Sequence, residues 1–215
     1  MKLHSILIIF IFVFLSGCAS ITNLERSCGS PPNDDICLGG GTVPSGKEEL
    51  FETSSTQAVD ALKSDQFKEE LERFHSLFSK NGPHSKAWEN VDVSLVPNSL
   101  IGEVDGMTIT TYGGASGWFK KLAFGNMAFD GEKDGPIKLN RWALKRSSAS
   151  IANTIVHEAA HRIGLIHPNS SNDLEIADCE PPYVIGSLVE KYIDGKNWNS
   201  AGDCHLFKSP EWNEI

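Results

Sequence analysis

Residues 157–167 read HEAAHRIGLIH, at the end of a segment whose apolar residues recur with helical spacing. On a helix, a spacing of four places the side chains of His157 and His161 on one face, within reach of a single metal ion. Glu158 lies one position round from His157. It can therefore reach a water beside the ion without binding the ion, which suits a general base. The stretch predicts a helix that carries two metal ligands and a proton acceptor.

This helix is predicted to begin at a serine and to end at a glycine. Ser147, Ser148 or Ser150 can supply the N-cap, and Gly164 can adopt the left-handed conformation that ends a helix. The chain can then turn back so that His167 approaches the ion from another side. Three nitrogen ligands leave a fourth position for water, as a catalytic zinc site requires and a closed structural site does not.

The complete pattern H-E-x-x-H-x-x-G-x-x-H resembles the metzincin clan of zinc peptidases. Its chance occurrence in a chain of this composition is on the order of 1 in 10⁴ or less. Residues 135–140, GPIKLN, are similar to the strand that precedes the active-site helix in zincins. The resemblance covers about residues 135 to 190. It implies that zinc is held by His157, His161 and His167, with Glu158 as the catalytic base.

The resemblance also implies a fold class. We expect an α+β, zincin-like domain in which a small twisted sheet packs against the active-site helix and one or two further helices. Strands are predicted at residues 91–96, 107–112, 122–129 and 137–140. Helices are predicted at residues 56–80 and 183–194, and the glycine-rich residues 113–117 are predicted to form a flexible loop.

One feature departs from the metzincin pattern. Metzincins place a methionine in a tight turn beneath the metal, whereas the methionines of this chain all precede the motif: Met1, Met107 and Met127. Residues 181–185, PPYVI, are expected to build the turn instead, with Tyr183 or Ile185 under or beside the zinc. In some metzincins a tyrosine just after that methionine approaches the metal, so the resemblance implies that Tyr183 helps to hold the oxyanion. A buried tyrosine at a helix start is the alternative.

The missing methionine leaves a second ligand set open. Gluzincins take their third ligand from a glutamate on a later helix, and three glutamates are available here: Glu175, Glu180 and Glu190. The spacing of His167 matches the metzincin pattern and favours the histidine. The other histidines of the body are expected to lie at the surface: His75, His84 and His205.

The N-terminus is typical of an exported protein. Lys2 precedes the ten-residue apolar run Ile6 to Leu15, which is short of the roughly 20 residues that span a bilayer as a helix. Residues 15–18, LSGC, resemble the lipobox of bacterial lipoproteins, which implies that Cys18 is lipidated and becomes the mature N-terminus. The resemblance places the protein at the cell envelope. Ala19 then implies the outer membrane of a diderm cell, facing the periplasm or the cell surface.

The remaining cysteines form an even set: Cys28, Cys37, Cys179 and Cys204. In an oxidising compartment such a set predicts two disulfides. Three pairings are possible, and proximity in the sequence favours Cys28 with Cys37 and Cys179 with Cys204. The absence of a C-x-x-C pair argues against a cysteine zinc site.

Three segments are expected: a signal peptide at residues 1–17, a lipidated N-terminus and flexible tether at 18–47, and a zinc metallopeptidase domain at 48–215. The formal net charge is −9, so binding to a phosphate backbone would release few counterions, and nucleic acid is an unfavourable partner. The expected function is zinc-dependent hydrolysis of peptide bonds in a protein or peptide, or in the stem peptide of peptidoglycan. The alternative is a non-catalytic zinc-binding envelope lipoprotein, against which the retained Glu158 argues.

Overall fold

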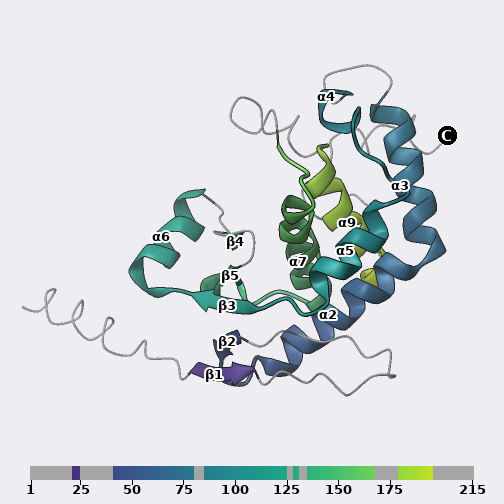
Figure 1. Ribbon diagram of the computed structural model, residues 1–215. Coiled ribbons are helices and arrows are strands. Elements are labelled where there is room, and N and C mark those ends of the chain that lie inside the picture. The colour runs from purple at the N-terminus through teal and green to yellow at the C-terminus, as the bar shows by residue number, and fades with distance from the viewer. Residues whose placement is uncertain are drawn as a thin grey trace, which may run out of the picture.

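The computed structural model describes residues 21–24, 41–79, 85–124, 128–130, 135–167 and 179–195. The described strands form a five-stranded sheet in the order β1-β2-β3-β5-β4. Their bounds are Ile21–Leu24 for β1, Gly41–Pro44 for β2, Ile109–Tyr112 for β3, Ala128–Asp130 for β4 and Ile137–Asn140 for β5. Strands β2, β3 and β5 are parallel, and β1 and β4 are antiparallel to their neighbours. The sheet lies beside a body of helices (Figure 1), so the coarse α+β prediction is confirmed.

The described helices outnumber the two or three that were expected. They are α2 (Glu48–Lys63), α3 (Asp65–Phe78), α4 (Ser85–Trp88), α5 (Val96–Val104), α6 (Gly114–Phe124), the 3-10 turn η1 (Arg141–Ala143), α7 (Ser148–Arg162) and α9 (Pro181–Asp194). Helix α7 packs against α2, α5 and α9, so it lies at the centre of the helical body. No helix among the described residues has the length and hydropathy of a membrane-spanning segment.

Helix α7 forms where the sequence predicts it. The hydroxyl oxygen of Ser147 accepts a hydrogen bond from the Ser150 amide at 3.2 Å, which selects Ser147 as the N-cap among the three candidates. Ile151, Ile155 and Val156 are fully buried. Burial of such side chains stabilises the fold by roughly 1.5–3 kcal/mol each. This apolar face fixes the rotation of the helix and therefore the direction in which its histidines point.

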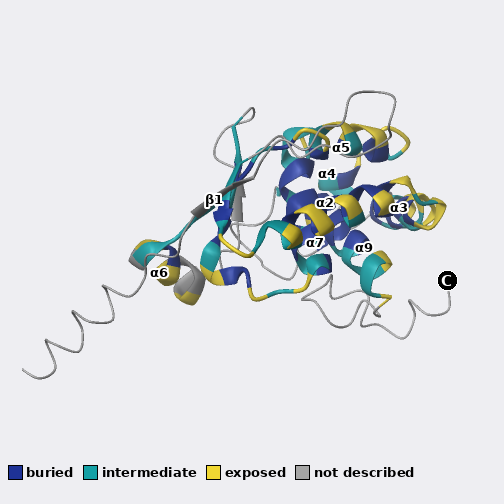
Figure 2. Ribbon diagram, turned by 90° about the horizontal axis from the view of Figure 1, so that it is seen from below, coloured by how far each residue is buried: buried dark blue, intermediate teal, exposed yellow. Residues whose placement is uncertain are grey.

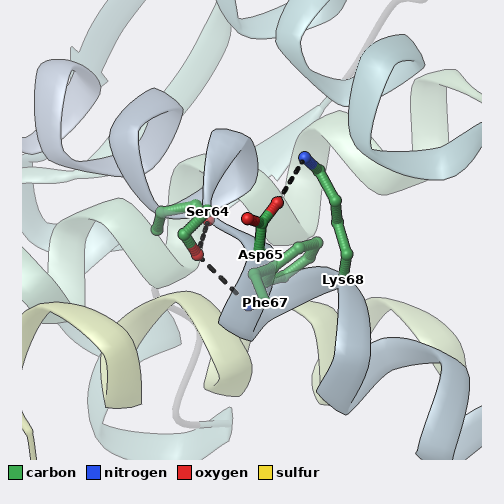
Figure 3. Close-up of polar contacts among 5 residues, drawn as sticks. Ser64, Asp65, Phe67 and Lys68 are labelled. Atoms are coloured by element: carbon green, nitrogen blue, oxygen red, sulfur yellow. Dashed lines mark hydrogen bonds and ion pairs between the residues drawn. The ribbon is translucent and has the colours of Figure 1, made fainter.

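The single helix predicted over residues 56–80 is wrong, because the chain bends at Ser64 into α2 and α3. Ser64 is extended (ψ 145°), and its hydroxyl accepts from the Phe67 amide at 3.1 Å while donating to the Ala61 carbonyl at 2.7 Å (Figure 3). Asp65 in the first turn of α3 pairs with Lys68 at 3.3 Å. A serine that caps the following helix competes with continuation of the preceding one, so the break has a local cause.

Two of the four predicted strands are confirmed in place, as β3 and β5. Residues 91–96 are a turn followed by the start of α5, whose first turn holds Pro97. Residues 113–117 are not a flexible loop, since α6 begins at Gly114, and only the end of the predicted 122–129 strand is β4.

Residues 21–24 and 41–44, which were predicted to belong to a flexible tether, are the strands β1 and β2 instead, while residues 25–40 lie outside the described residues. Gly41 begins β2, where a Cβ would collide with the backbone carbonyl oxygen of Ile109 on β3. In this glycine-rich stretch, which resembled a linker, Gly41 thus allows two strands to approach each other closely. The signal peptide and Cys18 lie outside the described residues.

Candidate metal centre

Three histidine side chains converge at the C-terminal end of α7. His157 and His161 come from the helix, and His167 comes from the segment after it. One nitrogen from each ring lies within 4.8 Å of the others, so the cluster could hold a metal ion. The two Nε2 atoms of His157 and His167 are 3.3 Å apart. The predicted ligand residues are therefore brought together.

The separation of these two nitrogens suits tetrahedral coordination. With Zn–N bonds of about 2.0–2.1 Å, two ligand atoms on a tetrahedron lie about 3.3 Å apart. The observed distance between Nε2 of His157 and Nε2 of His167 is 3.3 Å. The ring of His161 lies with its centroid 5.1 Å from that of His157 and 4.8 Å from that of His167.

Gly164 makes the turn that brings His167 back to the helix. Its φ is +93°, which confirms the predicted left-handed conformation. The Gly164 amide donates to the His161 carbonyl at 3.0 Å, and the Leu165 amide donates to the Ala160 carbonyl at 3.0 Å. These two bonds are the Schellman arrangement of a helix C-terminus, and they fix the direction in which the chain leaves α7.

Each of the three rings has an oxygen beside it away from the cluster. The Pro182 carbonyl accepts a hydrogen bond from His157, the Leu165 carbonyl lies 2.8 Å from Nδ1 of His161, and the Glu180 carboxylate contacts Nδ1 of His167 at 3.3 Å, an ion-pair distance. Histidines that bind metals almost always present one ring nitrogen to such an acceptor, which fixes the ring and leaves a lone pair on the other nitrogen. The surroundings of the cluster therefore fit a metal.

Glu180 is fully buried beside His167. It occupies the N-cap position of α9, but its side chain does not cap the helix. The preceding residue is held firmly: the buried indole N–H of Trp88 donates to the Cys179 carbonyl at 2.9 Å, and Cys179 is disulfide-bonded. The carboxylate is thus fixed where it contacts His167.

The three glutamates of the gluzincin alternative have different positions. The Glu180 carboxylate contacts the ring of His167 and is not among the clustered ligand atoms. Glu190 on α9 accepts a hydrogen bond at 2.7 Å from the side chain of Asn153, one turn before His157. Glu175 lies outside the described residues. Among the described residues, His167 is therefore the third member of the cluster.

Tyr183 in the first turn of α9 packs against two of the histidines. Its ring centroid is 4.6 Å from that of His157 and 4.4 Å from that of His167. Ile185, the other residue expected near the metal, is fully buried in the core. Residues 181–185 are therefore the first turn of helix α9 and not the tight turn that was expected to replace the methionine turn, although Tyr183 does lie beside the cluster.

Burial keeps two of the histidines neutral. It lowers the pKa of His157 from 6.5 to about 3, helped by the charges of His167 and His161, although the hydrogen bond to Pro182 opposes the shift. Burial lowers the pKa of His167 to about 4, with a smaller contribution from His161. Neutral imidazole is the form that binds a metal, so His157 and His167 are in their binding form at neutral pH.

Glu158 is buried in α7 near two residues that the sequence analysis missed. Burial raises the pKa of Tyr112, and the negative charge of Glu158 raises it further, whereas a hydrogen bond with Asn140 lowers it. Tyr112 and Asn140 are paired at the carboxyl ends of the parallel strands β3 and β5. Polar residues at that edge of a parallel sheet commonly form binding sites, and this signal could have identified both.

The remaining sequence predictions fall largely outside the described residues. Cys179 is disulfide-bonded, and its pairing with Cys204 stays a prediction, as does the pairing of Cys28 with Cys37. His75 lies partly buried on α3, its ring 6.3 Å from that of Trp88. His84 and His205 are not among the described residues.

No model of a known protein family matches the chain, and no curated protein or solved structure is significantly similar to it. The function is therefore inferred from the site itself. What the described residues show is a cluster of three histidines that could hold a metal ion, with a buried glutamate on the same helix.

Proposed function

We propose that this protein is a zinc metallopeptidase of the cell envelope, with a zincin-like fold. The observation that carries the proposal is that His157, His161 and His167 converge, while two carbonyls and the Glu180 carboxylate lie beside the rings away from the cluster. Imidazole suits zinc, copper, iron and nickel. Three histidines, of which His157 and His167 have their Nε2 atoms 3.3 Å apart as on a tetrahedron, together with a carboxylate in the H-E-x-x-H arrangement, favour catalytic zinc among these.

The order of elements around the site supports the zincin-like interpretation. Strand β5 leads through η1 into α7. The resemblance to zincins implies this order, a strand followed by the active-site helix. Strand β4 lies antiparallel to β5 at the edge of the described sheet and packs against α7. A sheet edge thus borders the helix that carries His157 and His161.

The edge strand β4 favours a peptide as substrate. Within the described residues, β4 pairs only with β5, so its other side has backbone groups available to a further strand. An extended peptide can add to such an edge through main-chain hydrogen bonds. This recognition does not depend on side chains, so it suits a protein, a peptide or the stem peptide of peptidoglycan.

Glu158 is proposed to move the proton in the reaction. A bound zinc would lower the pKa of water and polarise the scissile carbonyl. Glu158 accepts a proton from the attacking water and delivers it to the leaving amine. Its place near the C-terminal end of α7, with a buried side chain, keeps the carboxylate on the same helix and next in sequence to His157.

Tyr183 is proposed to donate a hydrogen bond to the oxyanion that develops on the scissile carbonyl. The contacts of its ring with His157 and His167 restrict the direction of its hydroxyl. A donor that is already oriented loses little conformational freedom during the reaction. Tyr183→Phe should therefore lower kcat more than it raises KM.

The proposal is tested by incubating the purified full protein with a peptide library and with an extract of envelope proteins, and identifying the products by mass spectrometry. Cleavage should stop after removal of metal by a chelator and return on addition of zinc. Zinc-loaded protein that cleaves nothing in either mixture would favour the non-catalytic zinc-binding alternative.

A further inference from the structure

Helix α6 presents large apolar side chains to solvent. Trp118, Phe119 and Leu122 are 51%, 56% and 69% exposed. Trp118 and Leu122 are four residues apart and so lie on one face of the helix. Figures 1 and 2 both show α6 apart from α2, α3 and α9. Exposed apolar residues that are scattered singly need no explanation, but a cluster on one element indicates an interaction surface.

The start of α6 and the start of β1 lie at the same end of the sheet. Ile21, the first residue of β1, pairs with Pro44, the last residue of β2. Strand β2 is parallel to β3, whose last residue is Tyr112, and α6 begins at Gly114. Since neighbouring strands are about 4.8 Å apart, the start of β1 and the end of β3 are separated by only about 10 Å.

The predicted lipid anchor lies very close to this end of the sheet. Cys18 precedes Ile21 by three residues, and three extended residues span at most about 11 Å. A lipid on Cys18 would therefore hold the adjoining end of the sheet near the bilayer surface. The long tether expected from the sequence would have allowed the body to move away, but β1 removes that freedom.

The charge of the region around α6 suits an anionic membrane. The chain as a whole has a formal net charge of −9, yet no acidic residue occurs between Asp105 and Asp130, where Lys120 and Lys121 are found. Lysines attract anionic lipid headgroups, and tryptophan favours the interface between headgroups and acyl chains. A helix with this composition can lie in the plane of the interface.

We propose that α6 inserts Trp118, Phe119 and Leu122 into the surface of the membrane that holds the lipid on Cys18. This inference rests on the cell-envelope location in the proposed function and on the lipid anchor that residues 15–18 predict. It is independent of the peptidase activity. The membrane then holds the body at two points, the lipid and α6.

The test uses the mature protein extracted from membranes and reconstituted in vesicles of phosphatidylethanolamine and phosphatidylglycerol with brominated acyl chains. Bromine quenches tryptophans that enter the bilayer. Quenching should be strong in the wild type, should be largely lost in Trp118→Phe, and should fall severalfold in Leu122→Asp. The matched control is Leu95→Asp, which changes a 59% exposed leucine at the start of α5 and should leave quenching unchanged.

Three outcomes would overturn the contact of α6 with the bilayer: no quenching in acylated wild type, equal quenching in Trp118→Phe, or a Leu122→Asp variant that loses peptide cleavage with quenching intact. The last result would make this face a substrate-binding surface. The intact mass of the same sample reports acylation of Cys18 separately. If the tryptophans are quenched but Cys18 carries no acyl group, the lipid anchor is wrong and the contact of α6 with the bilayer stands. If there is neither quenching nor an acyl group, both the anchor and the contact are wrong.

Discussion

The carboxylate of Glu180 lies 3.3 Å from Nδ1 of His167, with the glutamate fully buried. A carboxylate in this place orients the ring and raises the basicity of its other nitrogen. Glu180 was a candidate ligand on the sequence alone. The structure places it behind His167, and under the proposed function Glu180 is a positioning residue for a ligand.

Glu180→Gln should therefore lower zinc affinity by about 10- to 100-fold, the usual effect of removing such a partner. Competition with a chromophoric chelator measures the affinity. The matched control is Glu190→Gln, since Glu190 bonds Asn153 and should leave zinc binding nearly unchanged. The absorption spectrum of the Co²⁺-substituted protein should stay tetrahedral in Glu180→Gln. A spectrum that shows a lost ligand would make Glu180 a ligand itself.

His167→Ala should reduce zinc affinity more than Glu180→Gln does, because it removes a ligand and not its support. His75→Ala, which changes a histidine on α3 beside Trp88, is the control and should retain full affinity. Elemental analysis after gel filtration gives the zinc content of both. Full zinc content in His167→Ala would show that the third ligand lies elsewhere.

Gly164→Ala should destabilise the protein by roughly 1–2 kcal/mol, because alanine is strained in the left-handed conformation that Gly164 adopts at φ +93°. A Cβ there meets no other atom, so backbone strain alone is tested. Gly102→Ala is the control, because Gly102 lies within α5 and its Cβ would also meet nothing. That change should stabilise by about 0.5–1 kcal/mol. Urea unfolding measures both, and equal effects would contradict the assigned turn.

The metal-free protein should lose stability as the pH falls from 6.5. The folded-state pKa values of His157 and His167 are lowered to about 3 and about 4, so below pH 6.5 the unfolded chain takes up protons that the folded chain does not. The loss between pH 6.5 and 5 should be up to about 3 kcal/mol, about 1.6 kcal/mol from each histidine. Urea unfolding of chelator-treated protein measures it. A His157→Asn, His167→Asn double variant should show a smaller loss, and an equal loss would assign the dependence to other groups.

The local signals in the sequence predicted the centre of the site well. Ser147, Gly164 and the spacing of His157, His161 and His167 act within one helix and one turn, so short-range rules determine them. The break at Ser64 was missed although it is local, because the apolar spacing of the two helices continues across it. Contacts between distant segments were harder to predict: Glu180 behind His167, and Tyr112 with Asn140 near Glu158, depend on how α9 and the sheet pack.

The N-terminal region shows what amino-acid composition alone could not predict. Composition predicted a tether over residues 18–47, because Gly, Pro, Ser and Asn disfavour regular structure. The strands β1 and β2 form there because the edge of the sheet supplies partners that composition does not reveal. Gly41 illustrates this, since its lack of a side chain allows the close approach to Ile109.

The central claim is that Glu158 transfers a proton at a zinc site, and Glu158→Gln tests it most directly. Glutamine keeps the shape and a hydrogen-bonding group but cannot accept the proton, so zinc content and thermal stability should match the wild type. Peptide hydrolysis should fall by at least about 10²-fold, since general acid–base catalysis contributes roughly 10²- to 10⁴-fold. Zinc stoichiometry and the cleavage rate are measured on the same preparations. Equal cleavage by the two proteins at equal zinc content would contradict the account.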